Sequence, residues 1–118
     1  MPLSLETHNL IGQSELAHIK PTAFVINTSR GGIVEEQALA VALGEGKLGG
    51  AALNVLSGEP PPPDHPLRQL PNVILTPHLA FYSPESVVEL QTKAAEDVAR
   101  ALRGEPPRCP ANPEVLGS

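Results

Sequence analysis

The chain is poor in cysteine, aromatic residues and positive charge, and each shortage excludes a class of protein. Its one cysteine, Cys109, cannot form an internal disulfide, and such usage is typical of a reducing compartment, so we expect a cytoplasmic protein. Aromatic residues make up 3% of the chain and the formal net charge is −5. The sequence therefore offers neither a basic face for phosphates nor stacking rings for bases, and predicts no direct nucleic-acid binding.

Several patterns are also missing. The sequence contains no run of about 20 apolar residues, so it predicts no transmembrane helix. The first residues lack the basic and apolar segments of a signal peptide. The histidines and the cysteine have no metal-ligand spacing, which predicts no metal site. The sequence contains neither Gly-x-Gly-x-x-Gly nor a Walker pattern, so it has no glycine-rich phosphate-binding loop of these kinds. It also lacks Gly-x-Ser-x-Gly, the nucleophile motif of serine hydrolases.

The 118 residues suffice for one domain or part of one, and local patterns predict an α/β arrangement. Apolar runs that stop at turn residues predict three buried strands, and apolar spacing of three to four residues predicts helices. The expected strands cover 23–27, 49–56 and 72–76, and the expected helices cover 14–19, 35–43 and 84–103. Strand, helix and strand in this order indicate a parallel sheet.

Three features refine these elements. We expect Ser14 to cap the first helix, and Leu39 and Leu43 to face the core from the second. The last helix, of roughly 20 residues, is longer than packing on three short strands requires. After it, the proline-rich residues 105–118 are expected to form an extended tail, so that residues 1–104 make up the domain.

Each predicted strand is followed by an ionisable residue: Arg30, Glu59 and His78. The carboxyl ends of parallel strands are where ligands bind in open α/β sheets. Arg30 can hold a carboxylate at two points, His78 can transfer a proton near neutral pH, and Glu59 within reach would favour the charged imidazole. The three together predict an acid–base and anion site.

A simpler interpretation stands beside each of these residues. Arg30 can equally be a turn arginine paired with Glu35 or Glu36, and Glu59 an exposed loop acid. A single histidine is more often structural than catalytic, and we expect His8, His18 and His65 to be surface residues of that kind. The residue types alone leave both interpretations open.

Four motifs in order resemble the D-isomer-specific 2-hydroxyacid dehydrogenases. They are Pro-Leu-Ser-Leu-Glu-Thr from residue 2, Asn-Thr-Ser-Arg-Gly-Gly-Ile-Val-Glu from residue 27, Ala-Ala-Leu-Asn-Val-Leu-Ser-Gly-Glu-Pro from residue 51 and Asn-Val-Ile-Leu-Thr-Pro-His from residue 72. The resemblance runs from about residue 2 to residue 102. It implies hydride transfer between a nicotinamide cofactor and a 2-oxo or 2-hydroxy acid.

The resemblance also implies roles for individual residues. Arg30 would bind the substrate carboxylate, His78 would be the general acid–base, and Glu59 would orient and charge that histidine. Contacts with NAD, or equally with NADP, are implied for eight residues: Pro2, Thr28, Ser29, Arg30, Asn54, His78, Leu79 and Ala80. The partners expected are therefore a small 2-oxo or 2-hydroxy acid and the dinucleotide.

The sequence departs from the family pattern in three ways. Asn54 stands where the family usually has aspartate. Phe81 and Tyr82 resemble the C-terminal-binding-protein branch of NAD-sensing corepressors. The family's glycine-rich turn and ribose-binding acid would precede Met1, so we expect a partial Rossmann-like fold: the second half of a doubly wound parallel sheet with a long C-terminal helix. An unpaired sheet edge and an exposed apolar face would then favour self-association, such as a homodimer.

Three functions follow from these patterns. The first is a piece of a 2-hydroxyacid dehydrogenase that carries catalytic residues and is inactive alone. The second is a non-catalytic, NAD-responsive interaction module of the corepressor kind. The third is a decayed reading frame without activity. The presence of Arg30, Glu59 and His78 together favours chemistry over binding alone.

Overall fold

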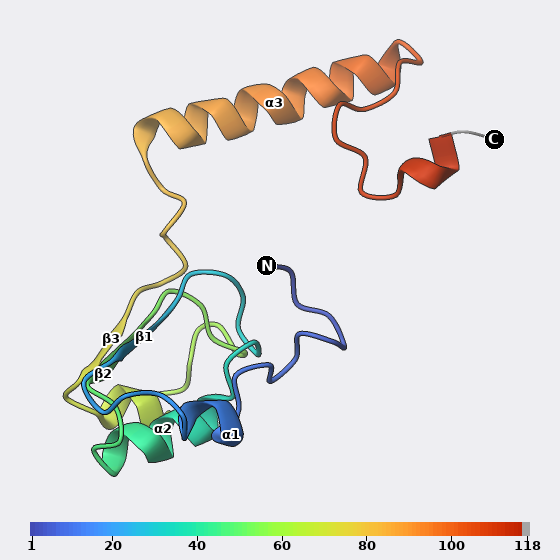
Figure 1. Ribbon diagram of the computed structural model, residues 1–118. Coiled ribbons are helices and arrows are strands. Elements are labelled where there is room, and N and C mark those ends of the chain that lie inside the picture. Colours follow the sequence, from blue (N-terminus) through green and yellow to red (C-terminus); the bar gives the residue numbers. More distant parts are fainter. Residues whose placement is uncertain (117–118) are drawn as a thin grey trace. The chain divides into compact units, whose positions relative to one another are not determined.

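The structure is a computed structural model that describes residues 1–116 and separates into two compact units, the first from Met1 to Ala80 and the second beginning at Phe81. The first unit contains α1 (Gln13–Leu16), β1 (Phe24–Asn27), α2 (Glu36–Gly44), β2 (Gly50–Leu53), the 3₁₀ helix η1 (Pro66–Gln69) and β3 (Val73–Leu75) (Figure 1). The second contains α3 (Pro84–Leu102) and the 3₁₀ helix η2 (Pro113–Leu116).

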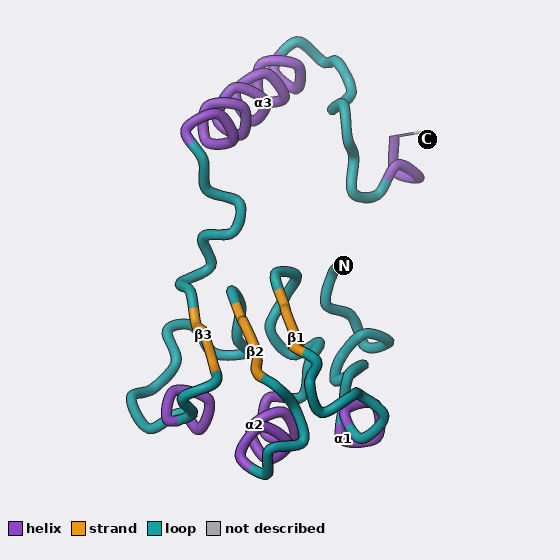
Figure 2. Tube along the Cα trace, turned by 60° about the vertical axis from the view of Figure 1, so that its left-hand side comes forward, coloured by secondary structure: helices purple, strands orange, loops and turns teal. Residues whose placement is uncertain are grey.

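The first unit is built on a three-stranded parallel sheet in the order β1-β2-β3, which confirms the expected α/β class (Figure 2). Each strand is only three or four residues long. The chain passes through α2 between β1 and β2, and through η1 between β2 and β3. These crossovers bring all three carboxyl ends of the strands to one edge of the sheet.

One face of the sheet is covered and forms the core. In register across it lie Val25, Ala51 and Val73, and then Asn27, Leu53 and Leu75. The apolar residues among these pack with the buried leucines of the covering helices, which are Leu39, Leu43 and Leu67. Leu39 is fully buried and Leu43 is 3% exposed, so both face the core as the helical spacing predicts.

The opposite face of the sheet is apolar and exposed. Phe24, Ile26 and Ile74 are 68%, 70% and 65% exposed, values unusual for large apolar residues on a sheet. In register, Ala52 lies between Ile26 and Ile74. The ring of Phe24 lies so close to Gly50 that a β-carbon there would meet a ring carbon at 2.8 Å. This face is therefore one continuous apolar surface.

The ends of two elements differ from the sequence prediction. Gly12, not Ser14, is the N-cap of α1, because the helix begins at Gln13; the carboxylate of Glu15 accepts the backbone N–H of Gly12 at 2.9 Å. β2 ends at Leu53, although the apolar run continues to Leu56. Val55 and Leu56 are 2% and 8% exposed in a loop, so their apolar character reflects burial without strand pairing.

The second unit consists of a long helix and a tail. α3 begins at the expected cap, where the Ser83 hydroxyl accepts the Ser86 N–H at 3.1 Å, and it has no buried residue. The sequence predicts an extended tail, but the tail contains η2 and is joined to α3 by an Arg108–Glu96 ion pair of 2.7 Å. Within residues 1–116, no helix combines the length and apolar composition that a bilayer crossing requires.

Candidate active site

Arg30 is placed by a buried asparagine at the end of β1. Asn27 is 7% exposed, its Oδ1 accepts the Ser29 N–H at 2.9 Å, and its Nδ2 donates to the Arg30 carbonyl at 2.9 Å. These two bonds fold residues 28–30 into a tight turn. The Arg30 side chain is exposed, and Nη1 donates to the Ser29 carbonyl at 2.7 Å. Within residues 1–116 it forms no ion pair, so the simpler pairing with Glu35 or Glu36 is absent.

Gly31 lets this turn contact the loop that follows β2. A β-carbon at Gly31 would lie 2.1 Å from the carbonyl carbon and oxygen of Leu56 and 2.4 Å from the Ser57 nitrogen. Real β-carbons essentially never approach backbone atoms so closely. Only glycine allows the two backbones to touch here. The contact brings the turn of Arg30 against the loop of Glu59.

Glu59 lies in that loop, and both of its carboxylate oxygens form hydrogen bonds. One carboxylate oxygen accepts the Leu56 N–H at 2.9 Å, and the other lies 3.0 Å from Nδ1 of His78. The Leu56 N–H is the largest cause that lowers the pKa of Glu59, followed by the hydrogen bond with His78, and the charge of Arg30 contributes further. Glu59 is therefore ionised near neutral pH and fixed toward the histidine.

His78 lies just after β3 with its backbone in the left-handed region, at φ +53°. Its N–H donates to two carbonyls, those of Asn54 and Thr76, at 2.9 Å each. A non-glycine residue in this region is uncommon, and strained residues of this kind concentrate at functional sites. Because the ionised Glu59 only accepts, Nδ1 carries a hydrogen, and Nε2 is the nitrogen available for proton transfer.

Asn54 links β2 to the segment that follows His78. Its Oδ1 accepts three hydrogen bonds, from the Thr76 hydroxyl at 3.0 Å and from the backbone N–H groups of Leu79 and Ala80 at 2.8 and 2.9 Å. Two backbone donors identify this atom as the oxygen, so the amide nitrogen points the other way. Asparagine thus fills the structural role that one carboxylate oxygen of an aspartate could fill.

Three hollows surround these residues. The first, of about 440 Å³, is lined by Arg30, Glu59 and His78 and by the glycines after Arg30. The second, also of about 440 Å³, is lined by Glu59 and His78 as well, together with Pro60 and Pro61. The third, of about 230 Å³, lies on the exposed sheet face and is lined by nine residues: Ile26, Thr28, Ala52, Leu53, Asn54, Ile74, Thr76, Leu79 and Ala80.

The third hollow is the candidate site for one end of the predicted dinucleotide. Its lining is mostly apolar and includes the small Ala52 of the middle strand, together with Thr28 and Asn54, which carry a hydroxyl and an amide. A flat ring with a carboxamide matches such a lining. Of the eight residues for which cofactor contacts are predicted, four line this hollow and Arg30 and His78 line the first. Ser29 lies in the Arg30 turn, and Pro2 accepts the Thr7 hydroxyl through its carbonyl.

Among the other histidines, His8 and His18 are exposed as predicted, whereas His65 is half-buried and forms hydrogen bonds of the structural kind. The His65 side chain is 15% exposed, and its Nε2 lies 3.1 Å from a carboxylate oxygen of Glu36. Local sequence patterns do not predict this pair, because 29 positions separate the two residues. No group of three or more potential metal-binding side chains occurs in the described part of the chain.

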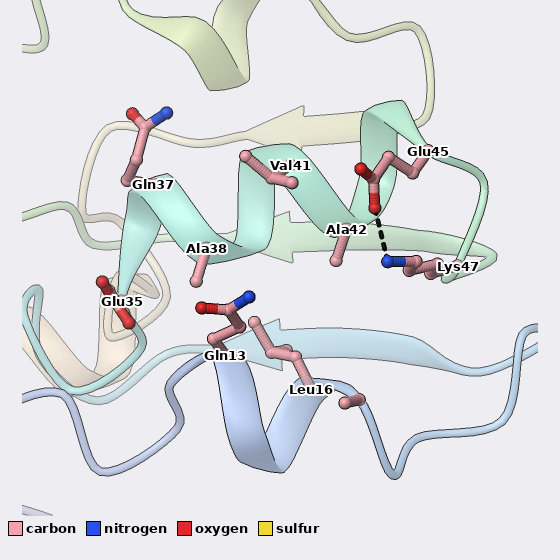
Figure 3. Close-up of a pocket in the computed structure, with 10 residues that line it drawn as sticks. Gln13, Leu16, Glu35, Gln37, Ala38, Val41, Ala42, Glu45 and Lys47 are labelled. Carbon is pink, nitrogen blue, oxygen red and sulfur yellow. Dashed lines mark ion pairs between the residues drawn. The ribbon is translucent and has the colours of Figure 1, made fainter.

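A further hollow of about 300 Å³ lies away from these residues, between α1 and α2 (Figure 3). Its lining includes Leu16 and Val41 and the exposed ion pair of Glu45 and Lys47. None of the predicted site residues lines it. The chemistry-bearing side chains therefore gather at the carboxyl edge of the sheet.

The lowered pKa of Glu59 predicts how acid acts on the site. Its hydrogen bonds are complete above the ordinary value of 4.5 and are lost as the pH falls from there through the lowered pKa. We expect the Leu56 amide resonance to titrate with the carboxylate, at a midpoint below 4.5. A ¹⁵N-resolved pH titration measures this. A midpoint at or above 4.5 in the folded chain would contradict the hydrogen-bonded geometry.

Comparison with known proteins points to one family. The model of a domain described as "D-isomer specific 2-hydroxyacid dehydrogenase, NAD binding domain" matches residues 1–80. Glyoxylate reductase of Thermofilum pendens is 44% identical over 116 residues, which are 98% of this chain and 34% of the reductase. The chain thus spans about a third of the length of the curated relatives it matches.

Solved structures give the same result. The TT0316 protein of Thermus thermophilus superimposes with a TM-score of 0.87 at 39% identity, over 94% of this chain and 35% of that one. D-Lactate dehydrogenase of Lactobacillus jensenii, solved with NAD⁺, superimposes with a TM-score of 0.81 at 32% identity, over 92% of this chain and 36% of the enzyme. The arrangement of strands and helices is therefore that of a dehydrogenase nucleotide domain.

Proposed function

The chain belongs to the D-isomer-specific 2-hydroxyacid dehydrogenase family, and we propose that it carries the catalytic edge of an enzyme that interconverts a 2-oxo acid and a 2-hydroxy acid with NAD or NADP. The observation that carries the proposal is the convergence of Arg30, Glu59 and His78 on one hollow. In this proposal residues 1–104 are part of the NAD-binding domain and residues 105–118 are a tail.

Arg30 binds the carboxylate of the acid. Its guanidinium lies exposed at the hollow, and only one of its N–H groups is used within the described residues, by the Ser29 carbonyl. A planar guanidinium holds a carboxylate through two parallel hydrogen bonds and so fixes its orientation. The neighbouring glycines leave room for the acid beside the backbone.

His78 transfers the proton. Nδ1 donates to Glu59, so a charged imidazole presents the Nε2 proton to the carbonyl oxygen of a 2-oxo acid, and the neutral form accepts that proton in the reverse reaction. The ionised carboxylate of Glu59 orients the ring and stabilises its positive charge. When bound, the nicotinamide supplies or accepts the hydride, with Thr28, Asn54, Leu79 and Ala80 as the residues that would hold its ring.

The names of the matched relatives indicate a class of substrate to propose. The matched reductases of Thermofilum pendens and Korarchaeum cryptofilum are named for glyoxylate, and that of Pectobacterium carotovorum is named for glyoxylate and hydroxypyruvate. We therefore propose a small 2-oxo acid of the glyoxylate class, acted on in the cytoplasm. The chain alone is expected to be inactive, because the sequence contains no glycine-rich phosphate turn.

An NAD-responsive module without chemistry is the alternative function. The exposed Phe81 and Tyr82 rings motivate it, since they are 54% and 64% exposed. A binding module has no need of a carboxylate hydrogen-bonded to a histidine beside an arginine that forms no ion pair within residues 1–116. The Glu59–His78 distance of 3.0 Å therefore favours catalysis.

A chimera tests the proposed function. Residues 1–104 would replace the matching third of the Thermofilum pendens glyoxylate reductase, with which the chain is 44% identical. We expect the chimera to oxidise NADH or NADPH with glyoxylate, and the 118-residue chain alone to show no turnover. A folded chimera that binds the cofactor without turnover would favour the non-catalytic module instead.

We also propose that the isolated chain self-associates through its sheet. The exposed apolar face of Phe24, Ile26 and Ile74 and the unpaired β1 edge both favour contact with a second copy. Light scattering is expected to show dimers or larger species. Ile26→Lys, at a position 70% exposed, should shift the chain toward monomer. A wild-type monomer with a sharp cooperative melt would contradict this proposal.

A further inference from the structure

Outside the three site residues, the first unit contains a second cluster of polar side chains. One carboxylate oxygen of Glu36 accepts both the backbone N–H and the hydroxyl of Ser57, at 2.6 and 2.8 Å. The other oxygen lies 3.1 Å from Nε2 of His65. The Glu36 and His65 side chains are 17% and 15% exposed, so this cluster is shielded from solvent more than the Glu59–His78 pair is.

The direction of these bonds is fixed by the chemistry of His65. Its Nδ1 accepts the Leu67 N–H at 3.3 Å as the N-cap of η1, so Nδ1 carries no hydrogen. The remaining nitrogen, Nε2, must then carry the hydrogen and donate it to Glu36. Glu36 thus accepts three donors with two oxygens, which an ionised carboxylate does well and a neutral amide does poorly.

The cluster contacts both ends of one loop. Ser57 and His65 enclose the segment 57–65, which contains Glu59 and four consecutive prolines. Glu36 belongs to the first turn of α2, whose leucines are packed in the core. The position of α2 is therefore fixed by the core, and the Glu36 carboxylate forms hydrogen bonds with the loop at both of its ends.

We propose that Glu36 is a positioning residue that holds the 57–65 loop so that Glu59 reaches Leu56 and His78. Glu59 lies two residues after Ser57, and its own contacts are local: the Leu56 N–H at 2.9 Å and the His78 ring at 3.0 Å. Without the bonds from Glu36 the loop would gain freedom, and both contacts would lengthen or break. The description of Glu59 and His78 as an acid–base pair rests on the proposed function, but the geometric dependence of Glu59 on Glu36 does not.

The test follows Glu59 directly in the 118-residue chain. In Glu36→Gln we expect hydrogen exchange of the Leu56 amide to accelerate about tenfold, the scale expected when one hydrogen bond is lost. The Glu59 carboxyl titration, read by ¹³C NMR, should move up toward the ordinary value of 4.5. Glu45→Gln is the matched control, because it removes an exposed acid from the other end of the same helix and should change neither readout.

A second variant keeps the test decisive if Glu36→Gln fails to fold. His65→Asn retains a side-chain acceptor for the Leu67 N–H but is too short to reach Glu36. It should accelerate Leu56 exchange in the same direction while the circular dichroism of the helices is unchanged. A folded Glu36→Gln or His65→Asn chain with wild-type Leu56 exchange and Glu59 titration would overturn the proposal. Neither readout needs cofactor or substrate, so an inactive chimera would count against the proposed function and leave this result unaffected.

Discussion

Replacing His78 by glutamine in the active chimera is expected to lower kcat about 1,000-fold, within the 10²–10⁴ range typical of a lost general acid–base. Glutamine can still donate a hydrogen bond to Glu59, so the loop should keep its position. It cannot deliver a proton to the carbonyl oxygen. Steady-state oxidation of NADH or NADPH with glyoxylate measures the loss.

The control for this prediction is His18→Gln, at an exposed histidine whose ring bonds the Ser14 carbonyl at 2.7 Å. It should leave kcat unchanged. Retention of kcat within fivefold in His78→Gln would assign the proton transfer to another group. The same result would leave the Glu59–His78 contact without a chemical role.

Replacing Gly31 by alanine is the second change with a large expected effect. The new β-carbon would meet the Leu56 carbonyl at 2.1 Å, and both partners are backbone, so no side chain can move aside. We expect a loss of about 3 kcal/mol or more in the free energy of unfolding, at the upper end for overpacked sites. In the chimera, turnover should fall as well, because the Arg30 turn and the Glu59 loop must separate.

Gly58→Ala provides the matched control. A β-carbon at Gly58 would have no atom within 4 Å, and the residue lies in the same loop. Its substitution should change the free energy of unfolding by no more than about 0.5 kcal/mol. Urea unfolding of the wild type, Gly31→Ala and Gly58→Ala measures the free energy of unfolding of each chain. Equal stability of the Gly31→Ala chain and the wild type would mean that the two loops do not touch.

The strands and helices follow from local patterns, so the sequence predicts them well. Leu39 and Leu43 occur at helical spacing, and both are buried. Apolar runs predict the end of a strand less accurately, because buried residues of the following loop can extend the run. Val55 and Leu56 are examples, because buried positions in a loop and in a strand favour the same apolar residue types.

The site residues could be named because each follows an apolar run at a strand end. The bonds that position them could not be predicted. Asn27 holds the Arg30 turn through two bonds, and Glu36 holds Ser57 and His65 across 21 and 29 positions of sequence. A glutamate in the first turn of a helix is ordinary for electrostatic reasons alone, so its residue type does not reveal a distant partner.

The absence of buried residues in α3 has a consequence for how the chain loses structure on heating. None of its 19 residues is buried, so its stability comes from the Ser83 cap, the Glu89–Lys93 pair, the backbone bonds and a few polar contacts with the tail, such as the Arg108–Glu96 ion pair. Helices held only by such interactions fray from their ends and melt gradually, whereas a packed core melts cooperatively. Heating should therefore give two superimposed curves, a broad loss of helical signal from α3 and a narrower transition from the sheet unit.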